Sequence, residues 1–303
     1  MSRLEWAFRD GLHYNEPLAR YTAARLGGPA DMLYVARQSP AELAEIVQAA
    51  WEEDVPVRVI GGGANILISD AGVAGLVVVN QVKRIEFSQW HDGRTVSATA
   101  GVRLTTLANQ CAKRGLRGFE WAVSVPGTLG GAIVNNAGAH GDDMGGAVCD
   151  VVVLDAAHGP QMMSLEDLDY DYRHSALKAR TDRRFLVLMA NLALPPGEEA
   201  DIRAKMQQFR AHRKATRPPG ASLGSIFKNP RGDYAGRLIE AAGLKGYCIG
   251  EAAVSEVHAN FFVNRGEATA ADYLALVRHV QAEVAQQTGT VLEPEIEIIG
   301  RQS

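Results

Sequence analysis

The amino-acid sequence predicts an α+β protein in which short strands and helices are mixed without regular alternation. Apolar runs of strand length, bounded by glycines, occur at residues 57–60, 66–68 and 76–79. Apolar residues at helical spacing mark two helices in this half of the chain, at 40–50 and 104–111. These helices are too few for a regular alternation of βαβ units, so a doubly wound parallel sheet is not expected.

The chain has 303 residues, which is longer than one hydrophobic core usually supports, so two domains are expected. Pro195, Pro196 and Gly197 interrupt the chain after the strand predicted at 185–192. We therefore predict one domain over residues 1–196, divided near residue 80 into two α+β subdomains, and a second domain over residues 197–303.

Composition restricts the kind of partner. The net charge is −4 with both signs interspersed, so neither a nucleic-acid surface nor a polybasic membrane-binding segment is indicated. No apolar run reaches the roughly 20 residues of a membrane span, and residues 1–6 lack the apolar core of a signal peptide. We expect a cytoplasmic, monomeric protein that binds small molecules. Cys111, Cys149 and Cys248 are widely separated, which argues against disulfides and a zinc site.

A run of three glycines, Gly61 to Gly63, lies between the strands predicted at 57–60 and 66–68. Without Cβ atoms, the backbone N–H groups of such a loop can converge on an anion such as a diphosphate. The run is not a Rossmann motif, because Ile66 replaces the third glycine and a strand follows where a helix is required. A tight hairpin without a ligand is the alternative interpretation.

A second glycine-rich stretch covers residues 125–138. Its glycine content predicts a loop that lies outside the core.

Capping residues predict three further features. Ser39 with Pro40 begins a helix, Asp233 is expected to cap another, and Thr269 with Asp272 forms a capping box before a third.

The chain is expected to end in a strand over residues 291–299. Period-2 alternation places Glu293, Glu295 and Glu297 on one face of this strand.

Five segments together, in this order, resemble the motif set of the MurB, UDP-N-acetylenolpyruvoylglucosamine reductase, family: residues 61–65, 126–132, 172–175, 224–230 and 292–296. The resemblance extends from about residue 21 to residue 300. It implies an FAD-binding domain of the vanillyl-alcohol-oxidase type in two α+β subdomains, followed by a small α/β substrate domain. It also implies reduction of the enolpyruvyl ether of UDP-N-acetylglucosamine to UDP-N-acetylmuramate for peptidoglycan synthesis, with FAD as cofactor and NADPH as co-substrate.

The resemblance implies that both glycine-rich stretches hold FAD, through Gly61, Gly62, Gly63, Ala64, Asn65, Ile66, Pro126, Gly127, Thr128, Gly130, Gly131, Asn136 and Gly138.

Three catalytic residues are implied by motif position: Arg173, Ser225 and Glu295. A guanidinium binds a carboxylate through two parallel hydrogen bonds, so Arg173 suits the substrate carboxylate. Glu295 suits a hydrogen-bond donor if its carboxyl stays protonated, which burial and adjacent negative charge favour. Ser225 is the expected proton donor to the α-carbon. Without the resemblance, these residues read as a surface ion pair, a turn serine and a solvent-facing strand glutamate.

Tyr172, Lys228 and Asn229 are implied substrate contacts, although a solvated Lys228 is equally compatible with the sequence. His174 and His258 lie in no metal or triad spacing, so structural roles are expected for both. Whether Lys228 and the basic cluster meet the UDP phosphates stays open; the cluster comprises Arg210, Arg213, Lys214 and Arg217.

Some residues depart from the family pattern. Ala24 and Ser124 replace an aromatic residue and a glycine, and the approach to Gly224 over residues 218–223 is unusual. The short path from Arg173 to residue 185 leaves no room for a substrate-covering loop, as in the shorter, type II branch of the family.

Two other functions share these glycine loops. One is an FAD-dependent oxidase on the same fold, in which the segment at 224–230 would have no role. The other is a flavin-binding protein without catalysis, in which Arg173, Ser225 and Glu295 would be dispensable.

Overall fold

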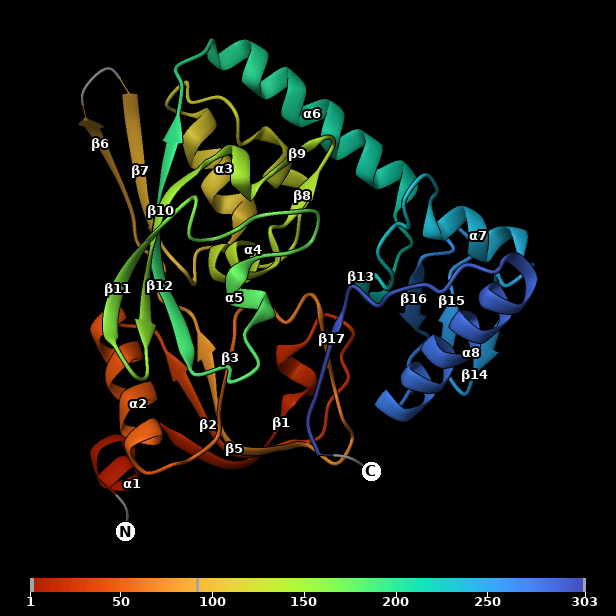
Figure 1. Ribbon diagram of the computed structural model, residues 1–303, viewed down its shortest axis with the longest axis horizontal. Helices are drawn as coiled ribbons and strands as arrows, with labels where there is room; N and C mark the ends of the chain where they lie inside the picture. The colour runs from red at the N-terminus through yellow and green to blue at the C-terminus, as the bar shows by residue number, and fades with distance from the viewer. Residues whose placement is uncertain (1–2, 91–92, 302–303) are drawn as a thin grey trace. The chain divides into compact units, whose positions relative to one another are not determined.

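The computed structural model describes residues 3–90 and 93–301, and it mixes α-helices with antiparallel and parallel strands (Figure 1). Among these residues, no helix is both long enough and apolar enough to cross a membrane.

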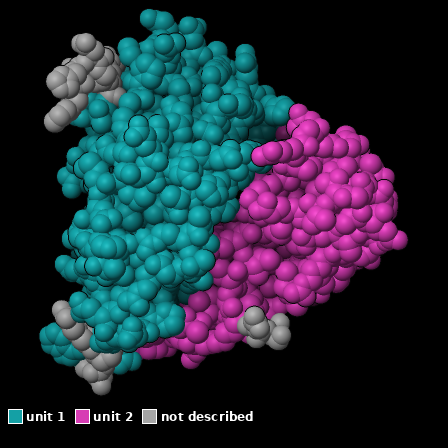
Figure 2. Space-filling view, viewed as in Figure 1, with its two compact units in different colours: residues 1–13, 33–62, 76–214 teal, residues 14–32, 63–75, 215–303 magenta. Residues whose placement is uncertain are grey.

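Backbone packing divides the chain into two compact units (Figure 2). One unit comprises residues 1–13, 33–62 and 76–214, and the other comprises residues 14–32, 63–75 and 215–303. The chain crosses from one unit to the other several times, the last time between residues 214 and 215. The domain boundary at residue 197 divides the sequence rather than these packing units, and it stays a prediction.

The first unit contains an antiparallel five-stranded sheet of order β11-β10-β12-β7-β6. Val151 and Leu192 of this sheet are fully buried and belong to the same core as Leu107 of helix α3. The bounds are β6 (Ile85–Trp90), β7 (Gly93–Thr99), α3 (Leu104–Ala112), β10 (Val148–Asp155), β11 (Gly159–Ser164) and β12 (Phe185–Leu194).

A four-stranded sheet has the order β1-β2-β5-β3, in which β3 and β5 are parallel. Ser39 begins helix α2 as predicted, because its side chain accepts from the Glu42 N–H and Glu42 bonds back to the Ser39 N–H. The bounds are α1 (Arg3–Phe8), β1 (Leu12–Pro17), β2 (Pro29–Ala36), α2 (Pro40–Glu52), β3 (Val57–Ile60) and β5 (Val73–Asn80).

The second glycine-rich stretch is not the peripheral loop that its composition predicts. It forms helix α4 (Leu129–Asn135), in which Leu129 and Ile133 are fully buried. The glycines serve close packing, since a Cβ on Gly130 would lie 2.8 Å from the Ala100 Cβ. Shorter elements of this region are η2 (Glu120–Ser124), β8 (Gly138–Ala139), β9 (Asp142–Asp143), η3 (Met144–Gly146) and α5 (Ala176–Ala179); helix α6 (Glu199–Thr216) follows β12.

The second unit has a four-stranded sheet of order β13-β16-β15-β14. Phe262 of the sheet and Tyr273 of helix α8 are fully buried in one core. Thr269 and Asp272 form the predicted capping box of α8. The bounds are η1 (Leu18–Tyr21), β4 (Ile66–Ile68), β13 (Ala221–Ser225), α7 (Ala235–Ala241), β14 (Cys248–Ile249), β15 (Ala252–Val254), β16 (Phe261–Asn264), α8 (Ala270–Thr288) and β17 (Glu297–Ile299).

The predicted cap of helix α7 is wrong by one residue. Tyr234 occupies the N-cap position, whereas the Asp233 carboxylate accepts the Tyr234 N–H and pairs with Arg237. The Asn229 side chain instead accepts the N–H of Ala235, the first helical residue, at 3.1 Å.

The predicted C-terminal strand is also shorter than expected. Only Glu297–Ile299 forms a strand, which pairs in parallel with β4. Before it, the Lys228 N–H donates to the Glu293 carbonyl and the Glu295 N–H donates to the Ile226 carbonyl. These two bonds flank a bridge between Pro294 and Phe227, so the missing N–H of the proline costs no hydrogen bond. The chain changes partner after Glu295, where the Glu297 N–H donates to the Asn65 carbonyl.

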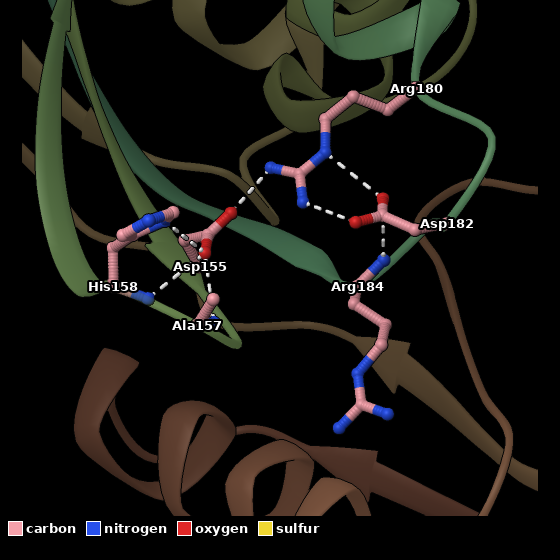
Figure 3. Close-up of polar contacts among 6 residues, drawn as sticks. All are labelled: Asp155, Ala157, His158, Arg180, Asp182 and Arg184. Carbon is pink, nitrogen blue, oxygen red and sulfur yellow. Dashed lines mark hydrogen bonds and ion pairs between the residues drawn. The ribbon is translucent and has the colours of Figure 1, made fainter.

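A charged network holds the segment between β11 and β12 against the β10–β11 turn (Figure 3). Arg180 bonds to both Asp155 and Asp182, and the buried Asp155 carboxylate also accepts the backbone N–H groups of Ala157 and His158. Burial by itself would raise the pKa of the Asp155 carboxyl. The hydrogen bonds from Arg180, Ala157 and His158 outweigh burial and hold this pKa well below its usual range.

The Asp155→Asn variant should unfold with a free energy about 2–3 kcal/mol below that of the parent protein, because the buried group that accepts the hydrogen bonds of Arg180, Ala157 and His158 loses its charge. A carboxyl whose pKa is depressed in the folded state stabilises the protein above its unfolded pKa, near 3.8 here, and the contribution is lost as pH falls further. Urea unfolding between about pH 5 and 2 should therefore show a shallower acid dependence for the variant.

Glu86→Gln is the matched control, since its ion pair with Arg84 is exposed. It should change stability by less than about 0.5 kcal/mol. Equal losses for Asp155→Asn and Glu86→Gln would contradict a stabilising role for the buried network.

Candidate functional site

Two glycines at the end of β3 lie directly against the loop before α4. A Cβ on Gly61 would lie 2.1 Å from the Thr128 Oγ1, and a Cβ on Gly62 would lie 3.1 Å from the Gly127 Cα. Gly127 itself has a left-handed backbone (φ 110°), which favours glycine. The two loops thus approach backbone to backbone, an arrangement suited to a phosphate group held by N–H donors.

The other predicted cofactor residues around the start of α4 differ in how closely they are packed. Gly130 donates its N–H to the Ala100 carbonyl, so its backbone is used in packing. Gly131 is exposed, and a Cβ there would meet nothing closer than the Thr128 Oγ1 at 3.9 Å. Pro126 is exposed as well.

Within the second unit, the rest of the first glycine loop is tied to the C-terminal segment. A Cβ on Gly63 (φ 57°) would lie 2.0 Å from the Tyr21 carbonyl oxygen, so only glycine fits. The Asn65 amide donates to the Glu295 carbonyl at 3.1 Å, and the Glu297 N–H donates to the Asn65 carbonyl. The predicted cofactor residue Asn65 therefore also fixes the backbone of Glu295. Ala64 precedes it in the loop, and Ile66 after it begins strand β4.

Arg173 occupies the third position of a tight turn over residues 171–174, closed by hydrogen bonds between the backbones of Asp171 and His174. Its backbone is left-handed (φ 54°), a conformation that a residue other than glycine adopts at a cost. The guanidinium donates to the carbonyls of Gly138, at 2.8 Å, and Asn136, at 3.4 Å. The exposed Tyr172 ring lies 5.2 Å from the Arg173 Cζ.

Ser225 and Glu295 lie on adjacent segments of the second unit. The Glu295 N–H bonds to the carbonyl of Ile226, the residue after Ser225, at 2.7 Å. A β-bulge separates the paired positions Ser222 and Ser225 of β13, and Gly224 within it has a φ of 81°. A bulge re-aims the side chain that follows it, which explains why glycine precedes Ser225. None of the residues that the structure describes hydrogen-bonds the half-buried Ser225 hydroxyl.

The predicted substrate contacts Lys228 and Asn229 are both engaged by protein groups. Lys228, whose side chain is only 20% exposed, pairs with Glu293. Asn229 caps helix α7, as described above. Their contacts with a substrate stay predictions.

The two histidines have structural surroundings. The His174 ring lies 3.3 Å from the Asp169 carbonyl oxygen. The His258 ring accepts the Asn260 N–H, and burial lowers the pKa of His258. Within residues 3–90 and 93–301, no three His, Cys, Asp or Glu side chains are placed to hold a metal ion.

One cation stands apart from the rest of the basic cluster. Arg217 is half-buried, its Cζ lies 5.4 Å from the Phe261 ring centroid, and its Nη2 lies 3.8 Å from the position of a Cβ on Gly224. Burial lowers the pKa of Arg217 to about 10, and no carboxylate in the described part of the chain pairs with it. Charge counting along the sequence does not distinguish it from Arg210, which bonds to Asn109.

Comparison with known proteins gives two matching domains and many relatives. Residues 32–154 match an FAD binding domain, and residues 215–299 match the C-terminal domain of UDP-N-acetylenolpyruvoylglucosamine reductase. The enzyme of that name from Rubrobacter xylanophilus is 42% identical over 289 residues, covering 95% of each chain. The one from Caldanaerobacter subterraneus is 40% identical over 303 residues, covering 99% of this chain and 98% of the relative.

The chain belongs to the UDP-N-acetylenolpyruvoylglucosamine reductase family.

The crystal structure of the family member MurB from Thermus caldophilus has a TM-score of 0.78 with 33% identity, and covers 93% of this chain and 97% of the other. The predicted family, the α+β fold and an FAD oxidoreductase activity in peptidoglycan precursor synthesis are thereby confirmed. The interpretations as an oxidase or as a non-catalytic flavin protein are set aside. Ser225 and Glu295 lie in the matched C-terminal domain.

The two glycine loops suit the diphosphate of the FAD that this reductase family uses. Backbone N–H groups can bind a phosphate only where no side chain blocks its approach. The Gly131→Ala variant should therefore fold normally, since the protein leaves room for the methyl group, yet it should bind FAD at least ~10-fold more weakly if the diphosphate lies there. Flavin absorbance of the purified protein and FAD titration of the apoprotein measure this.

Gly146→Ala is the control, because a Cβ there meets no neighbour within 4 Å, so the added methyl group is accommodated at this position too. Gly62→Val should in addition separate the loops and yield colourless protein. A Gly131→Ala protein with unchanged FAD affinity would refute the placement of the diphosphate at this position.

Proposed function

We propose that the chain reduces the enolpyruvyl ether of UDP-N-acetylglucosamine to UDP-N-acetylmuramate with NADPH. Family membership supports the overall activity. The assignment of catalytic roles rests on the backbone hydrogen bond between Glu295 and Ile226, the residue after Ser225. This bond places the proposed proton donor and a carboxyl group on two paired segments. A cytoplasmic location and a monomeric state stay predictions.

FAD, when bound, supplies a hydride carrier between NADPH and the substrate. Addition of hydride to the terminal alkene carbon breaks the carbon–carbon π bond and leaves negative charge on the α-carbon and its carboxylate. Groups that interact more strongly with this charge than with the ground state accelerate the reaction.

Arg173 is proposed to bind the substrate carboxylate. Its guanidinium offers two parallel donors, and its contacts with two backbone carbonyls limit its rotation. Glu295 is proposed to donate a hydrogen bond to the same carboxylate from a protonated carboxyl group.

Ser225 is proposed to donate its hydroxyl proton to the α-carbon, forming the second C–H bond, and to regain a proton from water. Serine is a weak acid, but an enolate-like carbon is a strong base. A hydroxyl without a competing partner in the described part of the chain is available to the substrate. The Gly224 bulge supports this role, because it fixes the direction of the side chain.

Of the basic cluster, Arg217 suits an anionic group of the substrate best. Arg217 is half-buried and has no carboxylate partner in the described part of the chain. Water therefore screens its charge less than it screens an exposed lysine or arginine. Tyr172, Lys228 and Asn229 are proposed to contact the substrate as well.

Ser225→Ala should leave reduction of FAD by NADPH within about two-fold of the parent rate, because that step needs no proton on the substrate. Reoxidation of the reduced protein by the enolpyruvyl sugar should slow by about 10²- to 10⁴-fold. Anaerobic stopped-flow measurement of each half-reaction tests this. Ser222→Ala, in the same strand, is the control; equal slowing of both half-reactions in Ser225→Ala would refute the assignment.

Arg217→Gln should raise the KM for the UDP-sugar about 10-fold, the loss of one charge contact, with little change in kcat. Steady-state kinetics at several salt concentrations measure this, with Arg213→Gln as the control. An unchanged KM would mean that Arg217 serves packing against Phe261 alone.

A further inference from the structure

The turn that carries Arg173 is fastened to the C-terminal end of helix α4. The last carbonyls of a helix have no partners within it. Here the side chains that flank the turn on either side donate to them: Tyr170 Oη donates to the Ile133 carbonyl at 3.0 Å, and Ser175 Oγ donates to the Val134 carbonyl at 2.6 Å. Ser175 is fully buried, and burial raises the pKa of Tyr170, so its phenol keeps the proton that it donates.

Asn136 connects the helix end to the turn. It is 2% exposed and has a left-handed backbone (φ 40°) at the C-cap of α4. Its Nδ2 donates to the Asp171 carbonyl at 3.0 Å and to the Asp143 carboxylate at 3.1 Å, and its Oδ1 accepts the Gly145 N–H at 3.1 Å. An amide has two N–H donors, and both have acceptors within the protein.

Asp171 is the first residue of the Arg173 turn, so the Asn136 amide holds the turn at its base. The backbone carbonyl of Asn136 meanwhile accepts from the Arg173 guanidinium. Asn136 therefore contacts both the backbone of the turn, at Asp171, and the side chain that the turn carries, the Arg173 guanidinium.

The left-handed conformation of Arg173 needs such support. A non-glycine residue in this region costs of order 1–3 kcal/mol and persists only where its surroundings impose it. Besides Asn136, the ammonium group of Lys178 donates to the Arg173 carbonyl at 3.2 Å. Without these contacts the turn would relax to a more ordinary conformation and carry the guanidinium with it.

We propose that Asn136 is a positioning residue that acts through Arg173, rather than a ligand of FAD. This inference rests on the proposed function, in which Arg173 binds the substrate carboxylate. It replaces the sequence-based expectation that the Asn136 side chain holds the cofactor.

Asn136→Gly is the direct test, because glycine tolerates the left-handed backbone and removes only the amide. The variant should bind FAD normally and be reduced by NADPH at the parent rate. Its reoxidation by the enolpyruvyl sugar should slow by about 10- to 100-fold, the effect of a misplaced contact at a reacting centre. If the glycine variant folds poorly, Asn136→Asp is the alternative, because it places a carboxylate against Asp143. It should likewise slow reoxidation while leaving reduction by NADPH at the parent rate.

A double-mutant cycle separates positioning from general structural damage. If Asn136 acts through Arg173, adding Asn136→Gly to Arg173→Ala should change the reoxidation rate by less than about two-fold. Additive losses would overturn the proposal.

Asp54→Gly is the matched control, since Asp54 is also left-handed (φ 52°) but its side chain is 90% exposed. It should leave both half-reactions unchanged. Loss of FAD from Asn136→Gly, or equal slowing of its two half-reactions, would assign Asn136 to the cofactor and overturn the inference. Failure of the unmodified protein to be reoxidised by the enolpyruvyl sugar would instead refute the proposed function.

Discussion

The close approach of the Gly62 and Gly127 backbones constrains the candidate cofactor site. Any side chain at position 61 or 62 would meet Thr128 or Gly127 and push the loops apart. The contact requires that the end of β3 and the start of α4 lie together in space. Helix α4 can in turn lie close to the end of β7 only because residue 130 is glycine.

A second constraint joins residues 65–68 to the C-terminal segment within the second unit. β17 pairs with β4, and the Asn65 amide holds the carbonyl of Glu295, 230 residues away in sequence. The same C-terminal segment pairs with the residues after Ser225. The proposed acid and the proposed hydrogen-bond donor are thus set by one piece of backbone, which limits their independent motion.

Two of the left-handed residues other than glycine lie where the proposed chemistry needs a fixed geometry. Arg173 and Asn136 are both left-handed residues other than glycine, and they contact each other. Gly224 provides the corresponding freedom before Ser225 without strain. A side chain that must face a reacting carbon within a fraction of an ångström requires a backbone that cannot relax, and side-chain amides provide much of that restraint.

Local signals in the sequence were sufficient for much of the fold. The helix start at Ser39 and the capping box at Thr269 depend on residues at most three positions away, so spacing alone predicted them. The order of five motifs determined the family, and with it the candidate residues Arg173, Ser225 and Glu295. Only the tertiary structure decided that Asn65 and Asn136 bond to distant backbone, that part of a glycine-rich stretch forms a helix with one buried face, and that the last segment changes partner after Glu295. Each of these depends on contacts between residues far apart in sequence, which local spacing and propensity do not encode.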